Sequence, residues 1–236
     1  MRLNLAAILF AIAIGVSAQA QTYTTNSYFQ AVNVGLPDDN PNGAASTINV
    51  SGLFGNIASL SVELNMTNGY NGDIYGYLYN SSSGGFAVLL NRVGVYGGDP
   101  FGYGDSGFHV TFTLDTNNIH FYQNQSYNLD GQGALLGSWG ADGRDVDPAT
   151  NSATLGSTDP TALLDAFVGT NPNGNWTMFL ADMSGGYQSY WANWQINLVT
   201  VPEPSTAGLA ALFGAAATFY FLRRQPKRTT AKAENS

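Results

Sequence analysis

The 236-residue chain has no cysteine and very few basic residues, and each shortage argues against a class of protein. Without cysteine there is no disulfide framework. Between Gln21 and Thr200 only Arg92 and Arg144 are basic, against fourteen acidic residues, which gives a net charge of −12 where the whole chain carries −8. Such a surface repels nucleic acids and anionic glycans, so DNA and RNA are disfavoured as partners. An anionic polysaccharide could be held only through a bridging divalent cation.

Helical patterns are also scarce, because apolar and polar residues alternate with a period of two, which is typical of strands. The clearest examples are residues 60–66 and 108–114, and further strands are expected at residues 46–50, 74–79, 86–93, 119–122, 176–181 and 191–199. One or two helical turns are expected over residues 161–168, with Asp159 as N-cap, Pro160 at the first position and Gly169 beyond the end. This pattern predicts an all-β fold, an antiparallel β-sandwich of jelly-roll type.

The N-terminus has the three parts of a signal peptide. Arg2 supplies the positive charge, residues 5–16 form an apolar segment, and Ala18-Gln19-Ala20 is an A-x-A cleavage site. The sequence therefore predicts a signal peptide over residues 1–20 and export of an ectodomain over residues 21–200, which is one ordinary domain. An exported domain without disulfides depends on packing, on a bound metal or on both, so a cation site is expected.

The C-terminus has three parts as well. The motif Pro202-Glu203-Pro204 ends the folded domain, because neither a strand nor a helix continues through both prolines. An apolar run follows over residues 207–222, and a basic cluster over residues 223–228. As a helix the run would rise about 24 Å, slightly less than the roughly 30 Å hydrocarbon core of a bilayer. The basic cluster predicts that this end lies in the cytoplasm.

These parts, over residues 201–228, resemble the PEP-CTERM sorting signal of bacteria that secrete exopolysaccharide. The resemblance implies that an exosortase, a membrane-embedded cysteine protease, recognises Pro202, Glu203 and Pro204 and removes the tail. The protein would then be anchored transiently in the membrane by its C-terminal helix before it reaches the cell envelope or extracellular matrix. A permanent single-pass anchor is the alternative.

An oxygen-rich loop near the start of the ectodomain predicts calcium binding. The segment Asp38-Asp39-Asn40-Pro41-Asn42-Gly43 fits the pattern D-x-[DN]-x-[DN]-G, the first half of a calcium loop. Position twelve would be Asn49, not an acid, so the segment is not an EF-hand. The predicted ligands are Asp38, Asn40 and Asn42, with more distant contributions from Asp73 and Asp182. An Asx-turn stabilised by its own hydrogen bonds is the alternative.

Two motifs have a catalytic form but lack the necessary context. Residues 102–107 fit G-x-G-x-x-G, yet a strand follows where a dinucleotide site needs a helix, which favours a glycine turn. The same segment contains Gly104-Asp105-Ser106-Gly107, which is similar to the nucleophile segment of chymotrypsin-like proteases. In that family the histidine precedes the serine, whereas His109 and His120 both follow Ser106. No catalytic residue is therefore predicted, and the chain is not expected to be an enzyme.

Three remaining polar features are interpreted as structural. His109 and His120 have no metal-ligand spacing to one another, so surface or structural roles are expected. The acidic cluster around Arg144 is expected to be a solvated loop and consists of Asp142, Asp145 and Asp147.

Four ordered segments resemble the P domain of proprotein convertases. They are residues 71–78 (NGDIYGYL), 88–92 (VLLNR), 173–182 (NGNWTMFLAD) and 194–198 (WQINL), within a similarity that spans residues 28–199. In that family the jelly roll packs against a subtilisin-like catalytic domain, for which these 236 residues have no room. Trp176 and Trp194 are expected to be large core anchors on facing strands.

Three functions remain open from the sequence. The first is a non-catalytic exported module in the envelope or exopolysaccharide matrix, with a structural or adhesive role and calcium as cofactor. The second is a carbohydrate-binding module for exopolysaccharide or cell-surface glycan, because tyrosines cluster at positions 70, 75, 77, 79, 96 and 103 and sugars stack on aromatic faces. A platform of coplanar exposed rings would favour it. The third is an accessory P domain of a subtilisin-like serine endopeptidase encoded elsewhere.

Overall fold

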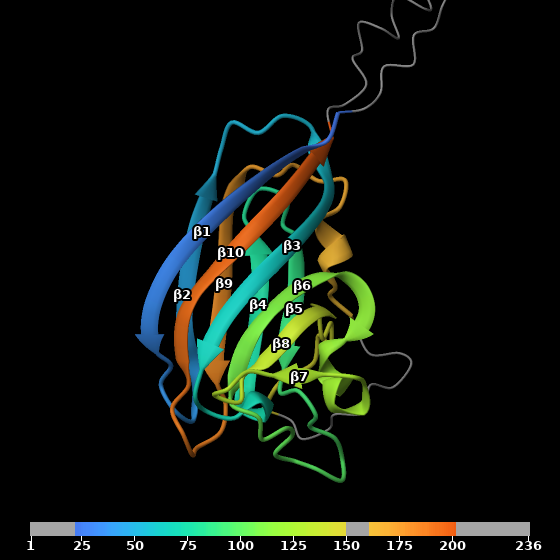
Figure 1. Cartoon of the computed structure of the whole chain (residues 1–236). Coiled ribbons are helices and arrows are strands. Elements are labelled where there is room, and N and C mark those ends of the chain that lie inside the picture. Colours follow the sequence, from blue (N-terminus) through green and yellow to red (C-terminus); the bar gives the residue numbers. More distant parts are fainter. Residues whose placement is uncertain (1–21, 150–160, 202–236) are drawn as a thin grey trace, which may run out of the picture.

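Two β-sheets packed face to face make up the computed structural model, which describes residues 22–149 and 161–201 (Figure 1). One sheet has six strands in the order β1-β10-β3-β6-β8-β7, and the other has four in the order β2-β9-β4-β5. The all-β class is therefore confirmed. The predicted signal peptide, the Pro-Glu-Pro motif, the apolar run and the basic cluster lie outside the described residues.

Ten strands and three short 3-10 helices occur in the described ranges. The strands are β1 (Thr24–Gly35), β2 (Asn40–Val50), β3 (Asn56–Thr67), β4 (Ile74–Asn80), β5 (Phe86–Asn91), β6 (Gly107–Asn118), β7 (Asn128–Leu129), β8 (Leu135–Gly140), β9 (Gly174–Asp182) and β10 (Tyr190–Val201). The helices are η1 (Asn71–Asp73), η2 (Ile119–Asn124) and η3 (Leu164–Phe167). None of these helices is long and apolar enough to cross a membrane.

Several sequence predictions need correction. The segment at 119–122 is the helix η2 and not a strand, because Asn118 caps it by accepting a hydrogen bond from the His120 amide. The expected helix at 161–168 is only the single turn η3, since Thr161 forms a β-bridge with Arg144 instead. Its predicted cap, Asp159, and Pro160 lie outside the described residues. The sheets are also not purely antiparallel, because β8 runs parallel to β6.

The period-two pattern places side chains correctly along most of β3 and β6. Leu60, Val62, Leu64 and Met66 are buried between the sheets, and Phe108, Val110 and Phe112 are buried in the same layer. Leu114 is the exception and is exposed. It lies beyond the last pair with β3, Val62↔Phe112, and beyond Thr113↔Gly140, after which the regular pairing with β8 is interrupted.

The two predicted tryptophan anchors are confirmed. Trp176 on β9 and Trp194 on β10 come from opposite sheets, and both are fully buried. The indole Nε1 of Trp194 donates to Ser46 Oγ on β2 at 2.9 Å, so one residue connects the two layers. Trp176 donates to the carbonyl of Pro172 at 2.9 Å and packs on Phe167 of η3 with ring centroids 4.9 Å apart.

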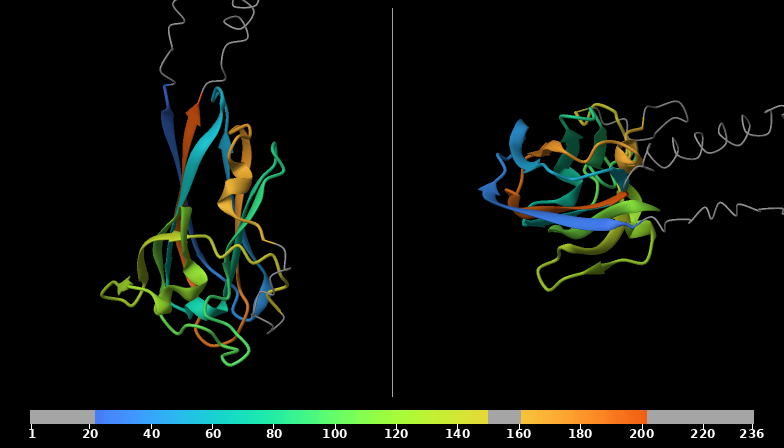
Figure 2. Two further views of the ribbon diagram at one scale, coloured as in Figure 1. Left: turned by 90° about the vertical axis from the view of Figure 1, so that its right-hand side faces the viewer. Right: turned by 90° about the horizontal axis from the view of Figure 1, so that it is seen from above.

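The strand directions give the sandwich two distinct ends (Figures 1 and 2). At one end, Thr24 on β1 pairs with Thr200 on β10, so both described limits of the domain lie together. The opposite end carries the connections at residues 36–39, 68–73, 92–106 and 183–189. We call this second end the loop pole, and the candidate site lies there.

Candidate functional site

The helix η1 is a rigid Asn-Gly-Asp turn that delivers Asp73 to the loop pole. Asn71 is fully buried, accepts the Gly107 amide at 2.8 Å and donates to the Tyr122 hydroxyl at 3.2 Å. A Cβ on Gly72 would lie 2.1 Å from the carbonyl oxygen of Phe101, so only glycine lets the 92–106 loop approach this closely. The carboxylate that follows is 4% exposed.

Asp182 is the last residue of β9 and continues its inward face. Trp176, Met178, Leu180 and Asp182 are all buried at alternate positions, so the carboxylate lies where the next core side chain would be. Its Oδ2 accepts from the Ser189 hydroxyl at 2.9 Å and from the Ser189 amide at 3.3 Å. Its Oδ1 is buried without a hydrogen-bond partner, which is costly for a carboxylate oxygen.

The sheet register brings these acids together. Asp182 pairs with Ile74, the residue after Asp73, and on its other side with Asn40. Burial, and then the negative charge of Asp182, raises the pKa of Asp73 from 3.8 to about 7, although Arg92 acts in the opposite direction. Burial also raises the pKa of Asp182, against the hydrogen bonds from Ser189. Keeping both Asp73 and Asp182 ionised at the loop pole therefore lowers the free energy of unfolding.

The five predicted calcium ligands are brought to one end of the molecule but do not form a closed set. The negative charge of Asp38 acts to raise the pKa of both Asp73 and Asp182, and Asp38 Oδ2 accepts a hydrogen bond from the Gly186 amide at 3.2 Å. Asn40 Oδ1 accepts the amide of Asn42 at 2.9 Å, which is the Asx-turn alternative, and the Asn42 side chain is exposed. Among the described residues, no three acidic or histidine side chains converge as a ready-made metal centre.

Two cavities open at the loop pole, and Asp73 lines the first of them. The first, of about 220 Å³, is lined by Asp73, Ser184, Gly-rich backbone and the rings of Tyr70, Phe101 and Tyr103. The second, of about 380 Å³, shares Tyr70 and adds the side chains of Asn68, Ser106, Tyr187 and Gln188. The ring of Tyr187 meets that of Tyr70 edge to face, with centroids 5.6 Å apart. The residues that line the two cavities come from three of the four connections at this pole, 68–73, 92–106 and 183–189.

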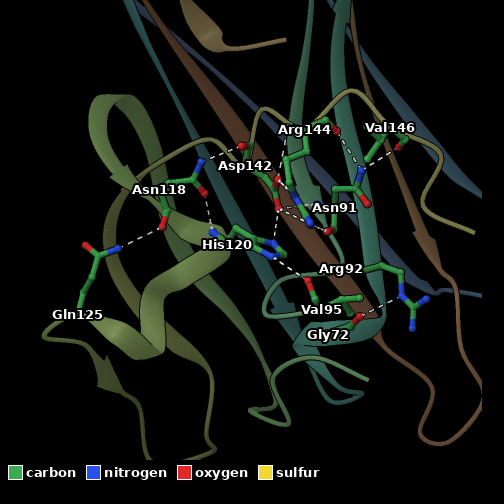
Figure 3. Close-up of polar contacts among 10 residues, drawn as sticks. All are labelled: Gly72, Asn91, Arg92, Val95, Asn118, His120, Gln125, Asp142, Arg144 and Val146. Carbon is green, nitrogen blue, oxygen red and sulfur yellow. Dashed lines mark hydrogen bonds and ion pairs between the residues drawn. The ribbon is translucent and has the colours of Figure 1, made fainter. Parts of the chain in front are cut away.

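A buried polar network supports the base of the 92–106 loop (Figure 3). Asp142 accepts from Arg144 Nε at 2.7 Å and from the Asn91 amide at 3.1 Å, and it lies 3.0 Å from His120 Nδ1. Asn91 in turn donates to the carbonyls of Arg144 and Val146, each at 2.9 Å. The prediction of a solvated loop is therefore wrong for Asp142 and Arg144, although Asp145 and Asp147 are exposed as expected.

His120 connects this network to the loop. Its Nε2 lies 3.1 Å from the carbonyl of Val95, and its ring has no exposed surface. Both ring nitrogens face oxygen acceptors, so both contacts are hydrogen bonds only when the imidazole carries both protons. The structural role expected for His120 is consistent with this position. Burial acts to raise the pKa of Asp142, but the hydrogen bond from His120 and the charge of Arg144 outweigh burial and lower it.

Arg92 holds the other side of the loop. Its guanidinium donates to the carbonyl of Gly72 at 3.3 Å and to that of Pro100 at 3.2 Å, so it joins the loop to η1. Its backbone has φ of 50°, a left-handed conformation that is unusual outside glycine and is often found near functional sites. Sequence reasoning did not assign it a role, because an isolated arginine after a strand has no distinguishing pattern.

The residues of the Gly-Asp-Ser-Gly segment do not assemble with a histidine. His109 Nδ1 pairs with Asp130 Oδ2 at 2.9 Å on the surface, and His120 is enclosed. No hydrogen bond joins Ser106 to either histidine in the part of the chain that the structure describes. Asp105 instead accepts from Tyr122 at 2.8 Å and from Gln123 at 2.7 Å.

The predicted tyrosine cluster separates into two groups. Tyr75, Tyr77 and Tyr79 lie on the outer face of the four-stranded sheet, where the Tyr77 ring stacks on Phe179 with centroids 5.0 Å apart. Tyr77 is also tilted by 59° against Tyr75, so these rings are not a coplanar platform. Tyr70, Tyr96 and Tyr103 belong to the loop pole. Phe101 and Tyr187, which sequence reasoning missed, lie with them because single aromatics in glycine-rich loops show no periodicity.

Comparison with known proteins gives a limited result. No family model and no curated protein matches the chain. A chain in the crystal structure of the Aeromonas sobria serine protease and chaperone complex is 13% identical, with a TM-score of 0.42 over 77% of this chain and 28% of that one. The structure of the Aeromonas sobria serine protease is 14% identical, with a TM-score of 0.40 over 76% and 27%. This chain thus spans less than a third of those chains.

Proposed function

We propose that the chain is an exported, non-catalytic β-sandwich module of jelly-roll type that binds calcium at the loop pole. It acts in adhesion or matrix organisation at the cell envelope or in exopolysaccharide, where an exosortase delivers it through the Pro202-Glu203-Pro204 tail. The observation that carries the proposal is the buried pair of Asp73 and Asp182. The Oδ1 atom of Asp182 has no hydrogen-bond partner.

Calcium fits this pair on chemical grounds. The ion takes six to eight oxygen ligands, from carboxylates, hydroxyls, backbone carbonyls and water, so two acids do not have to be the whole set. Ser184, which lines the same cavity as Asp73, is a further oxygen donor. A divalent cation would also remove the electrostatic cost of holding Asp73 and Asp182 together in their charged forms. Catalysis by the pair is disfavoured because Asp182 has no exposed surface and cannot reach a substrate bond.

Replacing Asp73 with asparagine tests the calcium site. Because the folded-state pKa is raised to about 7, the stability that Asp73 contributes at low pH is lost as the pH rises through 7. In chelator at pH 8, Asp73→Asn is therefore expected to melt about 5 °C higher than the parent chain. Addition of 10 mM calcium is expected to raise the melting temperature of the parent by about 5 °C and leave the variant unchanged.

The matched control is Asp165→Asn, an exposed aspartate on η3 away from the loop pole. It should respond to calcium and to pH like the parent chain. Circular dichroism melting of the full-length chain in a non-ionic detergent provides the measurement. Equal melting of the parent in calcium and in chelator at pH 8 would remove calcium from the proposal.

Sorting is tested separately at the tail. Glu203→Ala is expected to leave the tail attached, because exosortase recognition is proposed to require the Pro-Glu-Pro motif. Immunoblotting of envelope and culture fractions should show the variant as a larger, membrane-retained species, while the parent is processed and released from the membrane. Efficient processing of Glu203→Ala would contradict recognition of this motif.

A further inference from the structure

The loop pole combines exposed aromatic rings with uncharged hydrogen-bonding groups. We use the term aromatic rim for the exposed rings of Tyr70, Phe101 and Tyr187 together with Tyr103, which is half-buried and packs on Tyr122. Phe101 is 71% exposed and Tyr187 is 67% exposed. Each belongs to a glycine-rich loop, whose backbone freedom would also allow a conformation with the ring buried. Exposed rings that gather around cavities indicate a binding surface rather than part of the core.

The polar groups beside the rim are free to bind a ligand. The Asn68 side chain and the Ser106 hydroxyl line the second cavity and make no hydrogen bond within the described ranges. Gln188 lines the same cavity and uses one amide hydrogen on the Leu36 carbonyl at 3.0 Å, which leaves its carbonyl oxygen as an acceptor. The site thus offers donors and acceptors without any positive charge.

The charge of the domain restricts the ligand. The described ranges contain no lysine, and both of their arginines are buried, so the surface of these ranges carries carboxylates and no exposed lysine or arginine. Phosphate groups, uronic acids and nucleic acids would be repelled. A sugar presents an apolar face of C–H groups that packs on an aromatic ring and hydroxyls that pair with amide, hydroxyl and carboxylate groups.

We propose that the aromatic rim and its two cavities bind a neutral polysaccharide chain. The cavities meet at Tyr70, and their volumes, about 220 and 380 Å³, place consecutive sugar units on either side of that ring. Tyr187 and Phe101 stack on the sugar faces at the two ends, and Asn68, Ser106 and Gln188 pair with hydroxyls. This inference deepens the proposed function by naming the ligand class at the loop pole, and it rests on that function being one of binding.

Affinity electrophoresis tests the proposal. The full-length chain, in a detergent without a sugar headgroup and with calcium present, is run through native gels that contain hydroxyethylcellulose, dextran or galactomannan. Retardation is expected in at least one neutral gel. In alginate no retardation is expected when the gel is run in chelator, where no divalent cation can bridge the carboxylates of the two molecules. Tyr187→Ala and Phe101→Ala are each expected to raise the apparent dissociation constant at least tenfold, because each removes one stacking face.

Matched controls exist at the other end of the sandwich. Tyr23 is 60% exposed near the start of β1, and Phe54 is 85% exposed between β2 and β3. Tyr23→Ala and Phe54→Ala should bind within twofold of the parent chain, and all four variants should melt within about 2 °C of it because these rings are exposed.

Three results would overturn the proposal. The first is the absence of retardation in every neutral gel, and the second is equal binding by the rim variants and the parent chain. The third is retardation that choline chloride abolishes and free oligosaccharide does not. The last result would assign the rings and Asp73 to a cation. Repeating the gels in chelator separates this proposal from the calcium site. Sugar binding without calcium-dependent stabilisation would remove only the calcium site, and calcium-dependent stabilisation without sugar binding would remove only the sugar site.

Discussion

Asp142→Asn is expected to lower the free energy of unfolding by about 3–5 kcal/mol, because it removes the carboxylate that neutralises the buried guanidinium of Arg144 and contacts the buried ring of His120. Asp142 and His120 have no exposed side-chain surface, and Arg144 has almost none. Asparagine keeps the size of the side chain but cannot neutralise the guanidinium of Arg144. At pH 7 the melting temperature should therefore fall by about 10 °C.

Two comparisons make the Asp142 result specific. Asp145→Asn changes an exposed aspartate three residues away and should alter stability by less than about 0.5 kcal/mol. The double variant Asp142→Asn/Arg144→Met should lose less than Asp142→Asn, since it also removes the buried positive charge that Asp142 neutralises. The lowered pKa of Asp142 means that its contribution is present above pH 3.8 and is lost as the pH falls below that value, so parent and variant should converge in acid. If Asp142→Asn lowered the free energy of unfolding by less than about 1 kcal/mol, Asp142 would not be the group that stabilises this buried network.

Trp194→Ala is expected to cost a similar amount, about 3–5 kcal/mol, through the cavity left between the two sheets. The residue has no exposed surface and is the point at which β10 of one sheet contacts Ser46 of the other. A large part of the stability of an ordinary domain would be lost, since the total is about 5–15 kcal/mol. Chemical unfolding followed by circular dichroism should show the midpoint shift without a change of slope.

Ser46→Ala separates the hydrogen bond of Trp194 from its packing. It leaves the indole N–H buried without a partner and should cost about 1–3 kcal/mol, less than the whole ring. Phe29→Ala on β1 is the control, because that ring is 61% exposed and its loss should change stability by less than about 0.5 kcal/mol. If Trp194→Ala were no worse than Phe29→Ala, Trp194 would not be a core anchor.

The sequence predicts the central strands well because their two faces differ in environment. The alternation in β3 and β6 corresponds to a buried and a half-buried face. β1 has no such hydrophobic pattern in its sequence, because its positions alternate only between exposed and half-buried, with Asn26 and Gln30 half-buried and Phe29 exposed. β7 has only two residues, and its pairing with β8 depends on the fold of the whole sheet.

The candidate site was predictable only in part. Asp73 and Asp182 stand out in the sequence as acids at strand ends, but only the register of β4 against β9 places them together. The burial of Asp142 could not be predicted, because three acids around an arginine resemble a solvated loop, and only the contacts of Asp142 with His120 and Asn91 distinguish it from the other two acids. Long-range packing of this kind has no local signature.

The position of β10 has a mechanical consequence. Its first residue follows the 183–189 connection that carries Tyr187, and its last described residue, Val201, directly precedes the Pro-Glu-Pro motif. A load applied at the ligand and resisted at the C-terminal end of the domain would therefore act on the two ends of one strand, about 40 Å apart. Tension would pass along the covalent backbone of β10, while the ladders to β1 and β3 on either side resist its withdrawal. A domain built in this way could bear traction without opening its core.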